Sequence, residues 1–333
     1  MALPELIILD VGHGNCALLR DTEAITIIDC APGPTLIDTL DDLGIHEIEH
    51  VLLSHADTDH IGGIAGLLRN ARLVVRNIYV NADAAKTTRS WYDFRIAVRE
   101  ARERSGTRVH TALTTTQSRL LVSGEVTIEV LAPLPEQILG GSGARGVDRR
   151  RLDTNSVSVV IRLVHRDHGI ALLPGDLDAG TLDGLLAAAT DLTASLLVFP
   201  HHGGRPGRSD SRIFAERLSE VVQPRLVIFS ISRERFKNPQ PDIVQGIRRA
   251  IPEAHILCTQ LSQRCAALPL ANAIFDHLTP LAAQGRALGS CCGGTVVVRI
   301  DGANTNYTPL ARAHRGFIRG QGVPTPLCLR QYF

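Results

Sequence analysis

A short polar loop after a buried strand gathers four side chains that can bind metal ions. Residues 52–63 read LLSHADTDHIGG, so an apolar run leads directly to His55, Asp57, Asp59 and His60. Side chains at alternate positions of an extended segment point the same way, so His55 and Asp57 can share one ion. Asp59 and His60 then turn towards a second ion. A helix N-cap would explain Asp59 but neither histidine, so the loop predicts a metal centre.

Two later strands also end on residues that bind metals. Residues 170–176 (IALLPGD) end at Asp176, and residues 196–204 (LLVFPHHGG) place His201 and His202 after another apolar run. Taken alone, Asp176 is equally well explained as a turn residue, whereas a structural role is the less favoured explanation of the paired histidines. Ligands at the carboxyl ends of adjacent strands can converge on one point, however. This favours a single site built from three strand ends.

The chemistry of such a site follows from its ligands. Imidazole with carboxylate suits zinc, manganese or iron(II). Two such ions bridge a water molecule, lower its pKa towards neutrality and aim the hydroxide at a phosphodiester, thioester, lactone or lactam. Asp10 and Asp29, each after an apolar strand, are candidates to orient the histidines, with turn or capping roles as the alternative. His13, in a Gly-His-Gly turn, either approaches the site or is merely exposed.

As a set, these motifs resemble the metallo-β-lactamase superfamily, most closely the hydrolase domain of the ComEC competence-protein family and its stand-alone relatives. The resemblance covers roughly residues 5–260 and implies a four-layer αββα sandwich with a two-metal site at one edge. The matching segments are 9–15 (LDVGHGN), 27–30 (IIDC), 55–63, 153–156 (DTNS), 172–177 (LLPGDL) and 200–203 (PHHG).

The resemblance also implies a role for each ligand. His55 and Asp57 would hold the first ion. The second would be held by Asp59, by His60, and by one of the paired histidines, with His202 favoured over His201. Asp176 would bridge both ions, and Asp59, Asp176 and His202 are the expected catalytic residues.

The sequence departs from the family pattern at three positions. Asp57 stands where the commonest pattern has histidine, although the competence-type branch often has aspartate there. Asn155 stands where many members have another histidine, and amides are weak ligands, so the first ion is expected to bind less tightly. Gln240 replaces the histidine of a His-Pro pair and is a candidate substrate contact.

Three functions are open at this point. The first is a two-metal phosphodiesterase or nuclease, with a nucleic acid or nucleotide as substrate. Phosphodiesters are favoured by the resemblance, by the carboxylate-rich site, and by the basic loop at residues 140–151, where Arg149, Arg150 and Arg151 are candidate phosphate contacts. The second is a thioester, lactone or lactam hydrolase on the same scaffold. The third is a metal-binding regulatory or scaffold protein with a residual site.

The seven cysteines are spread unevenly, and five of them follow residue 257. Residues 261–333 have few long apolar stretches, and segments of that kind often need a metal staple. A structural zinc is therefore predicted here, with unreactive buried thiols as the alternative. Its candidate ligands are Cys258, Cys265, Cys291, Cys292, His314 and Cys328.

Composition limits the protein class. The 333 residues are 44% hydrophobic and 21% charged, which is enough apolar surface for a full core. The net charge of +1 provides no overall field that would recruit nucleic acid. No apolar run is long enough to cross a bilayer, and the first residues lack the features of a signal peptide. We therefore expect a cytoplasmic chain with reduced thiols and no membrane association; a protein partner is not indicated.

Strand and helix signals alternate along the chain, which predicts an α/β fold. Residues 1–260 are expected to form the hydrolase domain, and residues 261–333 a cysteine-containing C-terminal extension that completes the last strands. Strands are predicted at residues 5–10, 16–19, 24–29, 50–54, 73–80, 119–122, 127–132, 156–164, 169–174, 195–199, 225–231, 254–259 and 296–300. Helices are predicted at residues 35–43, 61–70, 91–105, 179–189 and 243–250.

Overall fold

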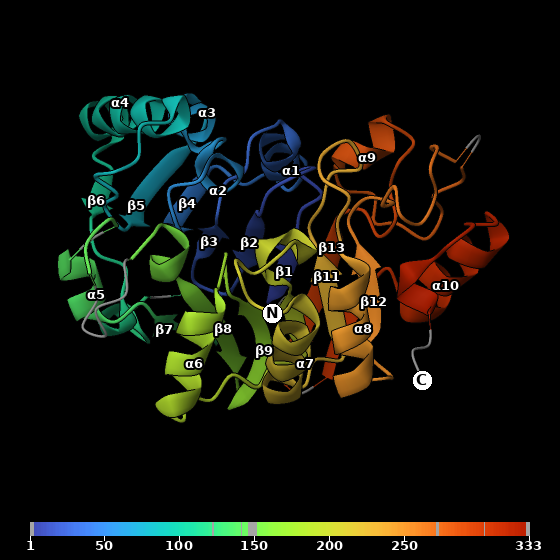
Figure 1. The fold of residues 1–333 in the computed structure, drawn as a ribbon. Helices are drawn as coiled ribbons and strands as arrows, with labels where there is room; N and C mark the ends of the chain where they lie inside the picture. The colour runs from blue at the N-terminus through green and yellow to red at the C-terminus, as the bar shows by residue number, and fades with distance from the viewer. Residues whose placement is uncertain are drawn as a thin grey trace.

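Two mixed β-sheets pack face to face, and helices cover the outer face of each (Figure 1). The computed structural model describes residues 3–121, 123–140, 142–145, 152–270, 273–302 and 304–330. In Figure 1, α1 to α4 lie above the first sheet and α6 to α8 lie below the second. The four-layer αββα sandwich predicted from the sequence is thereby confirmed.

The first sheet has the strand order β14-β13-β1-β2-β3-β4-β5-β6. Neighbours from β3 to β6 are parallel, whereas the other pairs are antiparallel. The segments that follow β3 and β4 therefore leave the sheet at the same edge. The strands are β1 (Glu5–Ile8), β2 (Ala17–Arg20), β3 (Ile25–Ile28), β4 (Glu47–Leu53), β5 (Val74–Val80), β6 (Arg108–His110), β13 (Val296–Asp301) and β14 (Asn304–Thr308).

The second sheet has the order β12-β11-β10-β9-β8-β7. Strands β9 to β12 are parallel, so the segments that follow them also share one edge. The strands are β7 (Val126–Ala132), β8 (Val160–His165), β9 (His168–Leu173), β10 (Leu196–Val198), β11 (Leu226–Phe229) and β12 (His255–Cys258).

Period-two alternation divides the core into three layers of apolar side chains. Leu6 and Ile8 of β1 face the second sheet, whereas Ile7 between them faces the outer helices. In β9, Leu173 likewise faces the first sheet, whereas Leu172 faces the outer helices. Each such side chain, when fully buried, contributes about 1.5–3 kcal/mol. The two sheets are thus held together along their whole common face.

The helices mostly follow the sequence pattern. Their bounds are α1 (Thr35–Asp42), α2 (Thr58–Ile61), α3 (Ile64–Arg69), α4 (Arg89–Ser105), α5 (Pro135–Gly140), α6 (Ala179–Ala187), α7 (Ser211–Val222), α8 (Pro241–Ala250), α9 (Gln284–Ala287) and α10 (Ala311–Gly320). Short 3₁₀ turns are η1 (Thr115–Gln117), η2 (Asn155–Val157), η3 (Pro200–Gly203) and η4 (Leu327–Leu329). No helix in the described ranges is both long and apolar enough to cross a membrane.

Three element predictions need correction. The helix expected at residues 61–70 is split into α2 and α3, because Gly63 lies so close to the preceding loop that a Cβ would be 2.3 Å from the Ala31 carbonyl oxygen. The strand expected at residues 119–122 is absent from the described residues 119–121, since Arg119 adopts a left-handed conformation with φ of 63°. The strand expected from residue 156 begins only after the turn η2.

Four helices, α5, α7, α9 and α10, were not predicted, although α7 had a readable signal. Its side chains Phe214, Leu218 and Val222 recur every four residues and are buried. Asp210 caps the helix by accepting a hydrogen bond from the Ile213 amide at 2.9 Å. Beyond residue 260, α9 and α10 were both unpredicted, and β13 joins the first sheet by pairing with β1.

Candidate metal centre

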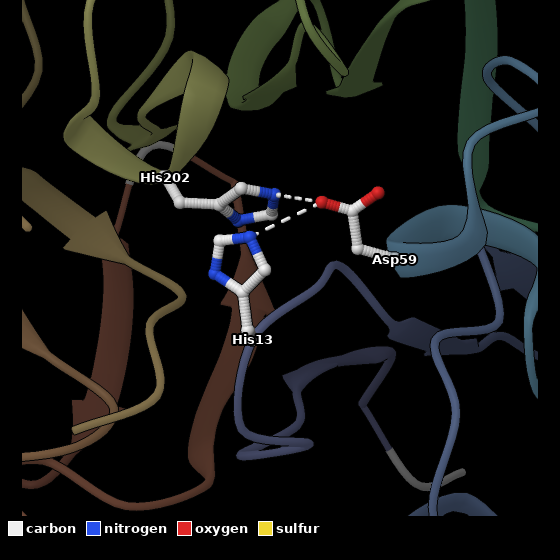
Figure 2. A group of neighbouring side chains, drawn as sticks. All are labelled: His13, Asp59 and His202. Carbon is white, nitrogen blue, oxygen red and sulfur yellow. Dashed lines mark ion pairs between the residues drawn. The ribbon is translucent and has the colours of Figure 1, made fainter. Parts of the chain in front are cut away.

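The predicted ligands lie at the edge of the sandwich where parallel strands of both sheets end. Strand β4 leads into His55 and α2, and strands β9 and β10 lead to Asp176 and His202. Asp57 occupies the N-cap position of α2 without a capping hydrogen bond from its side chain, and Asp59 lies inside the helix. Capping therefore does not account for Asp59, whose carboxylate is turned towards His13 and His202 in Figure 2.

A first group of donors consists of His55, His60 and Asp176. One ligand atom of each lies within 4.8 Å of the others. The two oxygens of Asp176 face different histidines: Oδ2 is 3.7 Å from His55 Nε2, and Oδ1 is 3.5 Å from His60 Nε2. Asp57 Oδ2 lies 3.6 Å from His55 Nε2 on another side. Asp176 is thus placed between two imidazoles, as a bridging ligand would be.

A second group consists of His13, Asp59 and His202 (Figure 2). Both histidines approach the same oxygen of Asp59, His13 Nε2 at 3.2 Å and His202 Nε2 at 3.4 Å. The groups are adjacent, since the His60 and His202 ring centroids are 5.5 Å apart. The expected assignment put His60 with Asp59 and His202. The structure instead places His13 in this group and His60 beside His55.

The donor atoms have the character of metal ligands. The Nε2 atoms of His55, His60 and His202 are buried, and none has a hydrogen-bond partner within the described residues. Buried polar atoms normally find partners, so three such nitrogens at one edge of a sheet require an explanation. Divalent ions such as zinc and manganese accept imidazole nitrogen and carboxylate oxygen, and the residues present fit them. The site has the donor set of a metal-dependent hydrolase.

Hydrogen bonds on the far side of each ring fix which nitrogen faces the site. The Nδ1 of His60 donates to Asp29 Oδ2 at 2.7 Å, and the Nδ1 of His202 donates to the Ser230 carbonyl at 2.9 Å. Such partners hold the tautomer in which Nε2 is free to bind a metal. The expectation that Asp29 orients a histidine is confirmed. Ser54 Oγ also donates to Asp29, at 2.8 Å, and so steadies the carboxylate.

His201, which precedes His202 in the chain, binds Asp176 through its backbone. Its backbone amide donates to Asp176 Oδ1 at 3.2 Å, and its Nε2 donates to the Leu177 carbonyl at 3.1 Å. Both His201 and His202 adopt the left-handed conformation, with φ of 51° and 53°. The two adjacent rings contact different partners: His201 contacts the Leu177 carbonyl and His202 contacts Asp59. His202 is the member of the pair that belongs to a donor group.

Mutual stabilisation of charge shows in the acid–base behaviour of the donors. Burial alone raises the pKa of Asp176, but His60, His201 and His55 outweigh it and hold this pKa well below the usual range. Burial also raises the pKa of Asp59, and its contacts with His13 and His202 reverse that effect. Burial lowers the pKa of His60, whereas Asp29 and Asp176 raise it well above its ordinary value. A divalent ion would take the place of the His60 proton.

The turn that carries His13 depends on one glycine. Gly14 has φ of 141°, and a Cβ there would lie 2.3 Å from the Asp59 carbonyl oxygen. The same carbonyl accepts a hydrogen bond from the Asn15 amide at 3.0 Å. The Gly-His-Gly turn is therefore fastened to α2, and this contact brings His13 to Asp59.

Lys86 is a site residue that the sequence analysis missed. Its ammonium group forms an ion pair with Asp57 Oδ1 and lies 3.4 Å from Thr154 Oγ1. Lys86 and Lys237 are the only lysines of the chain, but rarity alone could not place one of them beside a ligand 29 residues earlier.

Other predicted site residues are placed as follows. Asn155 begins η2, where its carbonyl accepts from the Ser158 amide at 3.1 Å, and a ligand role stays a prediction. Gln240 turns its amide to Arg264, which donates to it at 2.7 Å, so contact with a substrate also stays a prediction. Arg149, Arg150 and Arg151 lie outside the described residues. Asp10 orients no histidine: its carboxylate accepts instead from Gln260 at 3.0 Å and from the Gly285 amide at 2.8 Å.

The C-terminal cysteines cluster without forming a ready zinc site. Cys258, Cys265, Cys292 and Cys328 belong to one apolar core, whereas Cys291 lies against Asp10. His314 Nε2 is 3.2 Å from Cys292 Sγ. Nevertheless, among the described residues no third histidine, cysteine or carboxylate ligand atom lies within 4.8 Å of both Cys292 and His314. Burial raises the pKa of all five thiols. They are accounted for as protonated core side chains, and the zinc stays a prediction.

Comparisons with known proteins place this geometry in a family. Three solved structures with similar folds are YhfI of Bacillus subtilis (14% identity, TM-score 0.47, covering 77% of this chain and 96% of that one), the metallo hydrolase Igni18 of Ignicoccus hospitalis (14%, 0.42, 76% and 94%), and Tm1679, described as a metal-dependent hydrolase (12%, 0.46, 77% and 95%). No curated protein matches the chain. The family model of the metallo-beta-lactamase superfamily matches residues 9–207, which is more than half of the chain. The chain belongs to the metallo-beta-lactamase superfamily.

Proposed function

We propose that this protein is a metal-dependent phosphodiesterase that acts on a nucleotide or nucleic acid. The observation that carries the metal-dependent part is the pair of adjacent donor groups, with three buried Nε2 atoms that find no hydrogen-bond partner among the described residues. Two divalent ions, zinc or manganese, would occupy these groups. Asp176, between His55 and His60, is the candidate bridge.

When bound, the ions supply a hydroxide at neutral pH and neutralise the charge that develops on the substrate oxygens. The protein contributes position and electrostatics. Asp29 and the Ser230 carbonyl hold the rings of His60 and His202 in the ligand tautomer. Asp59 and Asp176 provide negative charge where cations are to be held, and their low pKa keeps them ionised at neutral pH.

Phosphodiester preference is supported by the cations that border the donor groups. Lys86 contacts Asp57 on one side. On the other, Arg235 and Lys237 are exposed and flank Phe236, whose ring lies against His13. Guanidinium and ammonium groups bind phosphate oxygens through charge-assisted hydrogen bonds. The family resemblance to competence-type hydrolases, which the comparisons do not test, points the same way, and so do Arg149, Arg150 and Arg151.

The direct test is hydrolysis of three substrates by the purified protein with zinc or manganese added. We expect turnover of bis-p-nitrophenyl phosphate, and little turnover of a thioester or a lactam. Preferential turnover of the thioester or lactam would contradict the phosphodiester assignment while leaving a metal-dependent hydrolase. Full metal loading with no turnover of any substrate would favour the regulatory or scaffold function.

Metal titration should reveal two unequal sites. The Lys86 ammonium group lies beside one oxygen of Asp57, and the other oxygen faces His55. A positive charge beside a ligand opposes the binding of a metal cation there. We therefore expect one tight and one weak manganese ion by calorimetry. Lys86→Met should tighten the weak site about tenfold, because it removes one charge near the ion.

The control for this titration is Lys237→Met, which removes the chain's other lysine charge. Equal tightening in both variants would show a general effect of net charge and contradict a specific role for Lys86. A crystal soaked in manganese that fills only the His55 and Asp57 position would contradict the predicted order of filling.

A further inference from the structure

An exposed aromatic ring stands at the rim of the metal centre. Phe236 lies in the loop between β11 and α8, and 63% of its surface is accessible. Its ring centroid is 4.8 Å from that of His13, which in turn is 4.4 Å from the ring of His202. Tyr92 is the other aromatic residue exposed to this degree in the described ranges. Exposure of a single apolar side chain is ordinary, but the Phe236 ring also contacts a member of the donor group, which places it where a substrate would bind.

The loop presents this ring on a fixed base. Arg233 is buried, and its guanidinium donates to the carbonyls of Leu261 at 2.9 Å and Ala266 at 2.8 Å. On the other side of the tip, the backbone amide of Gln240 donates to the backbone carbonyl of Gly203 at 2.8 Å, and Gly203 directly follows His202. Both ends of the loop are thus tied to the core, and one of them is tied to the metal centre itself.

The backbone at the tip is held in an unusual conformation. Phe236 has φ of 51°, in the left-handed region that residues with a side chain rarely adopt. Such conformations concentrate at functional sites, where the surrounding structure maintains them. A glycine would suit this backbone better than phenylalanine does.

Positive charges flank the ring. Arg235 and Lys237 are exposed on either side of Phe236 in the chain, and the Arg235 guanidinium lies 5.9 Å from the ring centroid. Aromatic rings stack on nucleobases irrespective of their sequence, and neighbouring cations bind the phosphates. The His13 ring contacts both the Phe236 ring and the His202 ring, so a base stacked on Phe236 would lie next to the donor group of His13, Asp59 and His202.

From this arrangement we infer that Phe236 is the stacking platform for a nucleobase and that the substrate is a nucleoside phosphodiester. This inference rests on the proposed function, because it assigns the base to Phe236 and the phosphate to the metal centre. It deepens that function by naming the side chain that holds the base, which the proposed function leaves open.

The test compares ligands with and without a base on the manganese-loaded protein. By calorimetry, adenosine 5′-monophosphate should bind about 5- to 150-fold more tightly than ribose 5-phosphate, the range expected for one stacked base. Phe236→Ala should remove most of this difference and leave the affinity for ribose 5-phosphate unchanged. Phe236→Trp should retain it, and Tyr92→Ala, which removes an exposed aromatic side chain elsewhere, is the matched control.

Two results would overturn the inference: equal affinities of the wild-type protein for the two phosphates, or undiminished binding of adenosine 5′-monophosphate by Phe236→Ala. Failure of the proposed function has a different signature. In that case adenosine would bind in a Phe236-dependent manner while ribose 5-phosphate would not bind at all. A dinucleotide and a ten-residue oligothymidylate distinguish the source of the base, because tighter binding of the oligomer assigns the site to nucleic acid and equal binding assigns it to a nucleotide.

Discussion

Replacing Asp176 with asparagine is expected to abolish hydrolysis, with a fall in kcat on the order of a thousandfold. Asp176 lies between His55 and His60, one oxygen towards each, and it also receives the His201 amide. The amide keeps the size of the side chain but loses the negative charge that binds cations. The fold should persist, because the substitution lies at the edge of the sheet. Steady-state kinetics, metal content and thermal unfolding would be measured together.

Asp178→Asn is the matched control for this substitution. Asp178 lies two residues away and caps α6 by accepting from the Thr181 amide at 2.7 Å, a role that asparagine fills about equally well. Its turnover and metal content should be those of the wild type. If Asp176→Asn also kept wild-type turnover, Asp176 would have no part in the mechanism, and a scaffold function would gain support.

Acid should strongly destabilise the fold, because His255 of β12 and His314 of α10 are buried histidines. Burial, with help from Arg315 and Arg248, lowers the pKa of His255 to about 4, and burial, with His255 itself, lowers the pKa of His314 to about 3. In the unfolded chain both titrate near 6.5. Below that pH the unfolded state binds protons that the folded state does not. The stability present above pH 6.5 is therefore lost progressively down to about pH 4 for His255 and pH 3 for His314.

For His255 alone, a pKa difference of roughly 2.5 corresponds to a loss of about 3 kcal/mol once the pH is below 4, of which about 2 kcal/mol falls between pH 7 and 5. Urea unfolding in the presence of a chelator, at pH 7, 6 and 5, measures it without interference from bound metal. His255→Gln should flatten the pH dependence, whereas a substitution at the exposed His168 should leave it unchanged. A free energy of unfolding that stays constant between pH 7 and 5 would show that His255 and His314 are not held neutral by burial.

The sequence predicted the metal centre because its information is local. Four donors within six residues, and strands that end on Asp176 and His202, show the pattern before any folding is known. Parallel pairing then brings the strand ends to one edge. By contrast, His13 reaches Asp59 only because the Gly14 turn is fastened to α2, and Lys86 meets Asp57 across a tertiary contact. The Gly-His-Gly turn leaves the approach of His13 to the site open as one of two alternatives, whereas spacing along the chain carries no trace of the Lys86 contact.

The failed element predictions have a similar cause. The pattern predicts a helix that Gly62 and Gly63 lead, but the approach of the Ala31 loop at Gly63 leaves both glycines between α2 and α3. The cysteine prediction was based on composition, which shows that thiols gather near the C-terminus. It does not show whether their sulfur atoms come within ligand distance. Cys258, Cys265, Cys292 and Cys328 pack in one apolar core, and a zinc there stays a prediction.

The pairing of β13 with β1 has a consequence for the order of assembly during synthesis. Ile8 pairs with Val296, so about 290 residues must be translated after β1 before its second neighbour exists. At ordinary elongation rates this takes roughly 15–60 s. Until then β1, which leads directly into the turn that carries His13, has an unpaired edge open to other chains. One of the earliest parts of the metal centre to leave the ribosome is thus among the last to be enclosed by its own sheet.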